Sequence, residues 1–370
     1  MDNRMPTMHA YRMETDDSMD GRFLASTPSV TNELLRLVAE IDEFKGAWQA
    51  ISRIEPDRLS RLRRVATIES IGSSTRIEGA RLTDREVESL LANIDIRSFA
   101  SRDEQEVAGY ADAMETVFAN WQAMDLTENH IRQLHLQLLR HTDKDARHRG
   151  EYKTLPNQAE AFDADGRSLG VVFETATPFE TPHRMADLIG WARTNLDRGA
   201  LHPLLAVGVF VAVFLAIHPF QDGNGRLSRI LTTLLLLRAG YEYVPYGSLE
   251  SVIEQTRDAY YLALRRTQGT LGTGAADWQP WLSYFLTALK RQKDRLQERI
   301  DRERLLFGNL PELSARILEI ARDRSRVSVA DAVLVTGASR NTLKGHFRAL
   351  AEAGHLNRHG AGRGTWYSPA

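Results

Sequence analysis

The stretch from residue 204 to residue 238 constrains this chain more than any other part of its sequence. Residues 204–217 read LLAVGVFVAVFLAI and carry no charge. They are fewer than the roughly 20 residues of a membrane-spanning helix, so they predict a buried element, and their length favours a helix over a strand. Residues 227–238, LSRILTTLLLLR, predict a second apolar helix. The polar sequence HPFQDGNGRLSR, residues 218–229, therefore covers a Gly-rich turn between two buried helices and the start of the second helix.

This turn carries groups suited to a polyphosphate. Gly223, Asn224 and Gly225 would leave bare N–H groups at the start of the second helix, where the helix dipole favours an anion. Asn224 also tolerates the unusual backbone angles expected of such a loop. Arg226 and Arg229 lie three apart on one helix face, and guanidinium groups bind phosphate oxygens through paired hydrogen bonds.

The turn also supplies a base and an acid. His218 is suited to take a proton from an attacking hydroxyl, because an imidazole titrates near neutral pH. Asp222 is a hard oxygen ligand of the kind that holds Mg²⁺ together with substrate phosphates. The alternative is that His218 and Pro219 only end a helix and that the arginines are solvated. The density of polar groups between apolar neighbours favours the phosphate site.

Residues 218–229 resemble the signature of the Fic family, His-Pro-Phe-x-Asp/Glu-Gly-Asn-Gly-Arg-x-x-Arg, at every fixed position. The resemblance implies a mainly α-helical fold with a short β-hairpin flap. It also implies an adenylyltransferase, which moves AMP from ATP to a Ser, Thr or Tyr hydroxyl of a target protein and releases pyrophosphate. His218 would then be the base and Asp222 the Mg²⁺ ligand. Residues 223–225 would cradle the α- and β-phosphates.

The resemblance further implies that Arg226 binds the β-phosphate and Arg229 the γ-phosphate. The related Doc proteins, which phosphorylate, carry Lys where this chain has Gly225, so nucleotidyl transfer is favoured over phosphorylation. Transfer of UMP or another nucleotide stays open. A different class of function also stays open, a DNA-binding regulator with a nucleotide-sensing Fic core. The intact His218 favours the enzyme, because a sensor needs no base.

A second pattern, STRIEG, occupies residues 74–79. Residues 68–77 predict the end of a helix. Glu78, at this end, could pair with an arginine. The pattern resembles the Fic inhibitory motif, Ser/Thr-x-x-x-Glu-Gly/Asn. The resemblance implies that Ser74, Glu78 and Gly79 belong to a built-in N-terminal inhibitory helix, whose Glu reaches Arg229 and displaces the γ-phosphate. In some relatives this Glu aligns a water that removes AMP, so Glu78-assisted removal of AMP is an alternative. Ordinary surface residues would also fit so short a pattern.

Two regions flank this expected centre. Residues 150–157 and 170–175 predict the strands of a hairpin, with a polar turn at 163–167. An open strand edge can capture an extended peptide, and the resemblance implies a flap around 152–175 that docks the target protein. A plain surface hairpin is the alternative. Tyr260 and Tyr261 lie on a predicted helix that, by the resemblance, helps to enclose the adenine, although aromatic stripes on helices more often pack in a core.

The C-terminal part changes character. Residues 290–305 predict a charged connecting helix, and residues 308–370 a winged-helix domain, with three helices (313–321, 329–335, 339–353) and two strands within 356–367. Nine Lys and Arg against five Asp and Glu give residues 311–370 a formal charge of +4. Arg340, Lys344 and Arg348 fall four apart on one helix face. DNA binding is therefore open, beside dimerisation and target docking.

Composition sets the remaining bounds. The 370 residues predict four parts: a flexible segment 1–27, a helical region 28–100 with the inhibitory motif, a catalytic core 101–307, and the winged helix 308–370. A formal net charge of −2 argues against bulk attraction to nucleic acid or membrane. The absence of cysteine excludes disulfides and thiolate metal sites. The polar N-terminus lacks the apolar core of a signal peptide, so we expect a cytoplasmic protein. The resemblance also suggests a homodimer.

Overall fold

The computed structural model describes residues 24, 26–54, 56–93, 99–142, 146–162, 168–273, 275–307 and 310–370. The expected flexible segment 1–27 and the turn at 163–167 lie mostly or wholly outside these residues. The chain divides into two compact units, Met1–Arg295 and Leu296–Ala370, and the division falls within one long helix.

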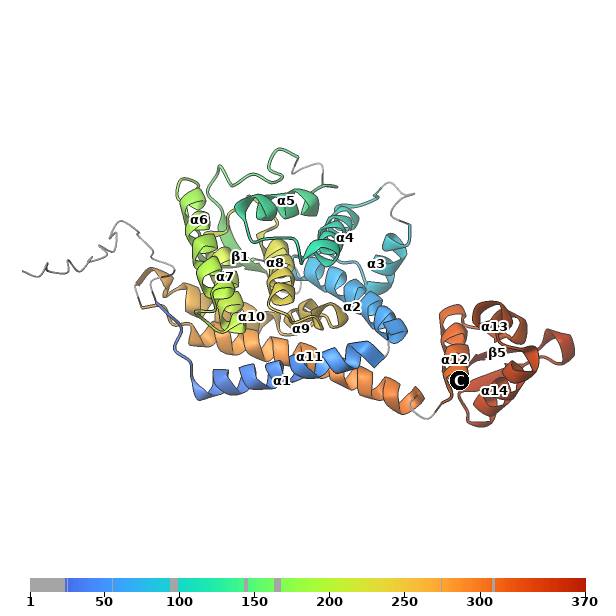
Figure 1. Ribbon diagram of the computed structural model, residues 1–370. Coiled ribbons are helices and arrows are strands. Elements are labelled where there is room, and N and C mark those ends of the chain that lie inside the picture. Colours follow the sequence, from blue (N-terminus) through green and yellow to red (C-terminus); the bar gives the residue numbers. More distant parts are fainter. Residues whose placement is uncertain are drawn as a thin grey trace, which may run out of the picture. The chain divides into compact units, whose positions relative to one another are not determined.

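The first unit is mainly helical, and Figure 1 labels its elements. Its helices and its two strands have these bounds: α1 Asn32–Ile54, α2 Pro56–Ile77, α3 Asp84–Leu91, α4 Arg102–Asn120, α5 Glu128–Leu138, β1 Gln158–Phe162, β2 Ser168–Glu174, α6 Thr181–Ala192, α7 Pro203–Ile217, α8 Asn224–Arg238, α9 Leu249–Gln255, α10 Arg257–Gln268 and α11 Gln279–Phe307. A short π-helical turn, Arg193–Asp197, continues α6. Two 3₁₀ turns lie at Val244–Tyr246 and Leu271–Thr273.

The two apolar segments form the centre of this unit. Every residue of α7 from Leu204 to Ile217 is buried, as expected for a helix that is apolar on all sides. In α8, Asn224 and the residues from Arg226 to Leu237 are buried, although the helix contains two arginines in its first two turns. Helices α2, α4, α5 and α7 all contact α8, which lies between them (Figure 1). The polar motif therefore lies inside a helical core.

Two helices frame the unit along one side. Helices α1 and α11 run side by side (Figure 1), and Lys290 of α11 pairs with Glu40 of α1 at 3.2 Å. The charged helix expected at 290–305 is part of a longer helix, Gln279–Phe307. Gln292, Leu296 and Ile300 are buried among its charged residues.

The hairpin differs from its expected position. β1 pairs with β2 in antiparallel fashion, but β1 begins at Gln158 rather than within 150–157. The preceding segment is extended and bonds instead to the turn that follows α7, through a bridge between Tyr152 and Phe220. Its alternating pattern reflects contact with that turn, not with β2.

The second unit contains three helices and a small sheet. The bounds are α12 Glu312–Arg324, β3 Val327–Ser328, α13 Val329–Thr336, α14 Arg340–Glu352, β4 Leu356–His359 and β5 Trp366–Pro369. The sheet is antiparallel in the order β3-β5-β4, and β3 is a strand that the sequence did not predict. Its core includes Ile317, Leu343, Phe347 and Tyr367.

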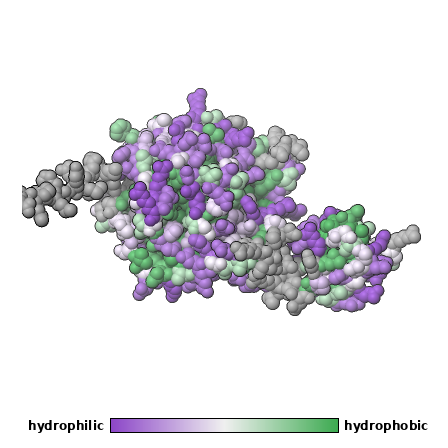
Figure 2. Space-filling view, viewed as in Figure 1, coloured by the Kyte–Doolittle hydropathy of each residue, from purple (hydrophilic) through white to green (hydrophobic). Residues whose placement is uncertain are grey.

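Figure 2 shows a mostly hydrophilic face, on which hydrophobic side chains form separate small patches. Among the described residues, none of the helices combines the length and the apolar character needed to cross a membrane.

Candidate active site

The site begins at the C-terminal end of α7. His218 is the residue that caps this helix, with a left-handed backbone (φ 52°, ψ 61°), and its N–H donates to the Phe214 carbonyl at 2.9 Å. Such a backbone costs a residue other than glycine roughly 1–2 kcal/mol, and costs of this kind cluster at functional sites. We had expected Asn224 to adopt the unusual backbone angles. That was wrong, because Asn224 is the first residue of α8.

Asn224 instead closes the turn through its side chain. Its Oδ1 accepts from the Phe220 N–H at 2.9 Å, and its Nδ2 donates to the Phe220 carbonyl at 2.7 Å. Gly223, with φ +80°, then leads into α8. Asn224, Gly225 and Arg226 thus form the first turn, whose N–H groups have no partner within the helix and lie at the positive end of its dipole. This is a potential anion site.

The nearest acceptor favours one tautomer of His218. Its Nδ1 lies 3.4 Å from the Leu215 carbonyl, which only accepts, so a hydrogen bond between them requires the ring hydrogen on Nδ1. The lone pair of Nε2 is then free. Burial, followed by the positive charge of the neighbouring Lys153 ammonium, lowers the pKa of His218 to about 4. The ring is therefore neutral at pH 7.

The two motif arginines are buried, not solvated. Arg226 lies between two carboxylates, with Nη1 3.1 Å from Glu106 and Nη2 3.5 Å from Asp222. Its Nε is buried and has no hydrogen-bond acceptor among the described residues. An unsatisfied guanidinium N–H inside the protein is costly, and a phosphate oxygen would satisfy it.

Arg229 contacts the upstream motif. Its Nε donates to Ser74 Oγ at 2.7 Å, and its Nη2 donates both to the Ser74 carbonyl at 2.9 Å and to Glu78 Oε1 at 2.7 Å. Glu78 directly follows α2, and Gly79 beyond it has φ +105°. The structure therefore brings the upstream and central motifs together.

The Glu78 carboxylate also covers the first turn of α8. A Cβ added to Gly225 would lie 2.2 Å from Glu78 Oε1, which means that the carboxylate occupies the space left by the missing side chain. An anion bound to this turn would have to displace it, since two negative groups cannot share the space.

Asp222 is the residue that the sequence analysis expected to hold a cation. Its side chain is partly exposed, and the Arg226 guanidinium and the Gly223 N–H help to hold the pKa of this carboxyl below its usual value despite its burial. Its Oδ2 is 3.3 Å from Arg102. The described residues contain no group of three or more His, Asp or Glu arranged around a metal. A single carboxylate still fits Mg²⁺, which takes most of its ligands from water and substrate phosphates.

The two tyrosines differ. Tyr260 is buried, and its ring packs against those of Trp281 and Tyr284 at centroid distances of 5.7 and 5.8 Å. Its ring therefore belongs to the core. Tyr261 is partly exposed, and burial followed by the charge of Glu78 raises its pKa. Of the two tyrosines, only Tyr261 is partly exposed.

Three residues of the site escaped the sequence analysis. Glu106 of α4 holds Arg226, and Lys153 bonds to the turn around His218. His135 is buried, and its ring stacks on that of Phe220 with the centroids 3.8 Å apart. Its Nδ1 accepts from the Gly150 N–H at 2.9 Å, so Nε2 carries the hydrogen and donates to the Asp222 carbonyl at 2.9 Å. Glu106 lies among other charged residues of α4, such as Asp103 and Glu104, so no local signal distinguished it.

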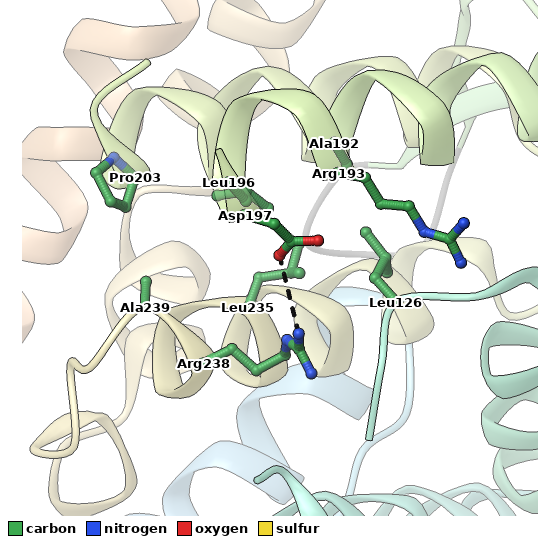
Figure 3. Close-up of a pocket in the computed structure, with 9 residues that line it drawn as sticks. All are labelled: Leu126, Ala192, Arg193, Leu196, Asp197, Pro203, Leu235, Arg238 and Ala239. Carbon is green, nitrogen blue, oxygen red and sulfur yellow. Dashed lines mark ion pairs between the residues drawn. The ribbon is translucent and has the colours of Figure 1, made fainter. Parts of the chain in front are cut away.

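A small pocket lies away from this site. Figure 3 shows its lining between the end of α6 and the end of α8, where Arg238 faces Asp197 at 3.9 Å. Its volume of about 80 Å³ is too small for a nucleotide.

In the second unit, Arg340, Lys344 and Arg348 are all exposed on α14.

Comparison with known proteins identifies the central motif. Residues 125–236 match the Fic/DOC family. The Drosophila willistoni protein named protein adenylyltransferase Fic is 29% identical over 232 residues, which are 62% of this chain and 42% of that protein. The Drosophila melanogaster protein of the same name is 30% identical over 261 residues, 69% of this chain and 46% of that protein. The chain thus spans less than half the length of these relatives.

Solved structures agree on the fold. A Fic family protein from Desulfovibrio desulfuricans G20 has a TM-score of 0.64 at 24% identity, covering 93% of this chain and 97% of that one. Fic-1 from C. elegans has a TM-score of 0.54 at 18% identity, covering 73% of each chain. The mainly helical fold class with a Fic-type core is therefore confirmed.

Proposed function

We propose that this chain, which contains a Fic domain and is homologous to the Fic protein adenylyltransferases, transfers AMP from ATP to a hydroxyl side chain of a target protein. The proposal depends most on the two hydrogen bonds between the Asn224 side chain and the Phe220 backbone. They hold the turn that begins at His218 against the first turn of α8. A neutral imidazole with a free Nε2 and an anion site on backbone N–H groups are thereby fixed to one another.

The reaction follows from these positions. The target oxygen forms a bond to the α-phosphorus of ATP, the bond from that phosphorus to the bridging oxygen breaks, and pyrophosphate leaves. The proton of the hydroxyl passes to His218 Nε2. The first turn of α8 and the Arg226 Nε–H stabilise the phosphate oxygens. Mg²⁺ would be held by Asp222 and would neutralise charge on the phosphates.

We propose that Glu78 makes the chain self-inhibited. The carboxylate occupies Arg229 and the space above Gly225, both of which a triphosphate would need. ATP would therefore bind in an unreactive position until Glu78 moves away. The same carboxylate could instead orient a water for the removal of AMP. Movement of α2 is opposed by Arg76, which bonds to Glu254 of α9 at 2.6 Å.

The target would dock beside the hairpin. Leu155, before β1, is 61% exposed, and Phe179, after β2, is 94% exposed. Exposed apolar side chains before and after a two-stranded ribbon suit an extended peptide, which would bond to a strand edge and bury its own apolar side chains there.

The test uses the Glu78→Gly chain with Mg²⁺ and ATP labelled at either the α- or the γ-phosphate. Only the α-label should become covalently bound, and intact mass should rise by one AMP. Glu78→Gly with His218→Ala should bind ATP, measured by calorimetry, without transferring label. Transfer of the γ-label would mean phosphorylation and would refute the proposal, as would undiminished transfer without His218. Parallel reactions with UTP, and AMP release from the labelled product by the wild type, test the two alternatives.

We propose a second, separate function for the C-terminal unit, namely binding of duplex DNA. The exposed face of α14 carries Arg340, Lys344 and Arg348 in successive turns, and Glu352 is the only acidic residue of this helix. The order of helices and strands, α12-β3-α13-α14-β4-β5, is that of a winged helix, in which the helix at the position of α14 enters the major groove.

A gel-shift titration with duplex DNA at 50 and 200 mM salt tests this. Arg340→Ala with Lys344→Ala should weaken binding at least ten-fold, whereas Arg322→Ala with Arg324→Ala, on α12, should change it little. No binding by the wild type at low salt would refute the function.

A further inference from the structure

We infer that Lys153 is a positioning residue for the proposed transfer: it fixes the turn that carries His218 and both ends of the β1–β2 hairpin at one ammonium group. The inference rests on the proposed function. The hydrogen bonds of Lys153 go to the ends of the hairpin and to the turn around His218, so it acts through these two parts.

The Lys153 ammonium is buried and makes three hydrogen bonds. The residue is 3% exposed. Its Nζ donates to Asn157 Oδ1 at 2.8 Å, to Thr175 Oγ1 at 3.0 Å and to the Ile217 carbonyl at 3.0 Å. An ammonium has three N–H donors, and each has one neutral acceptor. A buried cation without a directly bonded carboxylate is expensive, so a surface ion pair or simple packing does not account for it.

These three partners come from separate places in the chain. Asn157 directly precedes β1 and Thr175 directly follows β2, so the lysine joins the two ends of the hairpin. Ile217 is the last residue of α7 and precedes His218. Thr175 Oγ1 also donates to the Asn157 carbonyl at 2.7 Å, which closes the base of the hairpin.

The backbone of the same segment completes the attachment. The Lys153 N–H donates to the Pro219 carbonyl at 2.8 Å. Asn157 Nδ2 donates to the Phe220 carbonyl at 2.7 Å and approaches the His218 carbonyl at 3.4 Å. Four consecutive carbonyls, residues 217–220, are thus held by Lys153 and Asn157. They include the left-handed residue His218, whose backbone strain requires such external contacts to persist.

The consequence is mechanical. If the hairpin docks the target hydroxyl and His218 accepts its proton, then Lys153 sets the distance between hydroxyl and base. Misplacement of a reacting group by about 1 Å can cost a factor of about 100 in rate. ATP binding, which depends on α8 and Arg229, should be little affected.

The experiment compares Lys153→Met, Lys153→Arg and Thr175→Val in the Glu78→Gly chain. Lys45→Met serves as the matched control, because Lys45 also donates to a carbonyl after a helix, Ala239 at 2.8 Å, but away from the site. For self-modification, Lys153→Met should lower kcat at least ten-fold and change the KM for ATP less than three-fold. Lys153→Arg should restore part of the kcat, and Thr175→Val should lower it to a smaller extent. Lys45→Met should match the parent.

Amide hydrogen exchange on the same variants separates this inference from the proposed function. Lys153→Met should accelerate exchange in peptides that cover residues 152–158 and 217–224, even in a chain without transferase activity. If Lys153→Met misfolds, Thr175→Val carries the same two tests. An unchanged kcat, a KM effect as large as the kcat effect, or unchanged exchange at 217–224 would overturn the positioning role. Loss of AMP transfer in the parent with accelerated exchange in Lys153→Met would overturn only the proposed function.

Discussion

Glu78 and Arg229, 151 residues apart in the chain, form a hydrogen-bonded ion pair of 2.7 Å in which the guanidinium is almost completely buried. The same guanidinium binds Ser74, one helical turn before Glu78. Since the carboxylate also covers Gly225, one side chain occupies both the arginine and the helix N-terminus that we propose as the triphosphate site.

Removal of the Glu78 carboxylate should activate the protein. A hydrogen bond to a charged group contributes about 1.5–3 kcal/mol, so Glu78→Gly should raise the rate of AMP transfer roughly ten-fold or more. Initial rates of self-modification with α-labelled ATP measure this. Glu88→Gly, which removes an exposed carboxylate paired with Arg64, is the control and should not activate. Equal rates for wild type and Glu78→Gly would show that Glu78 does not inhibit.

Gly225→Ala tests whether the glycine at this position leaves room for the phosphates or only for the Glu78 carboxylate. The new Cβ would clash with Glu78 Oε1, so the substitution should expel the carboxylate. If the space serves the phosphates, Gly225→Ala should remain below one tenth of the activated rate even when combined with Glu78→Gly. Full activity of the double variant would show instead that the glycine only accommodates Glu78.

Glu106 should contribute strongly to stability. It is buried and forms ion pairs with Arg226 and Arg102. Its removal leaves a buried guanidinium with less compensation, which costs about 3–5 kcal/mol. Glu106→Ala should therefore lower the free energy of unfolding, measured by urea titration, by about that amount. Glu88→Ala, at an exposed pair, should cost about 0–1 kcal/mol. Similar values for the two variants would contradict the assigned role of Glu106.

Stability should fall as the pH drops from about 6.5 to about 4. Burial lowers the pKa of His135 to about 4 in the folded chain, below the ordinary value of 6.5, so the unfolded chain binds the proton more readily. The contribution of the neutral ring is complete above pH 6.5 and is lost as the pH approaches 4. At about 1.4 kcal/mol per pKa unit, the loss is on the order of 3 kcal/mol. Urea midpoints across this range should fall less in His135→Gln than in the wild type; parallel curves would contradict this origin.

Local patterns were sufficient for much of the helical framework. The uncharged run of 204–217 predicted α7 to within one residue, and the predicted helix at 329–335 corresponds to α13. Boundaries that depend on distant partners were less accurate. Residues 150–157 alternate like a strand, yet they pair with the turn at Phe220, because the alternating pattern does not identify the partner.

By itself, the sequence determined which residues make up the central turn and that this turn lies between two buried helices, since periodicity and the motif are properties of neighbouring residues. Only the tertiary structure decided that His218 takes the left-handed backbone, that Glu106 holds Arg226 and that Lys153 joins the hairpin to the turn. Each of these depends on side chains brought together from distant segments. The electrostatic interactions of these side chains become strong only when burial removes water from around the charges. A local sequence pattern does not predict that burial.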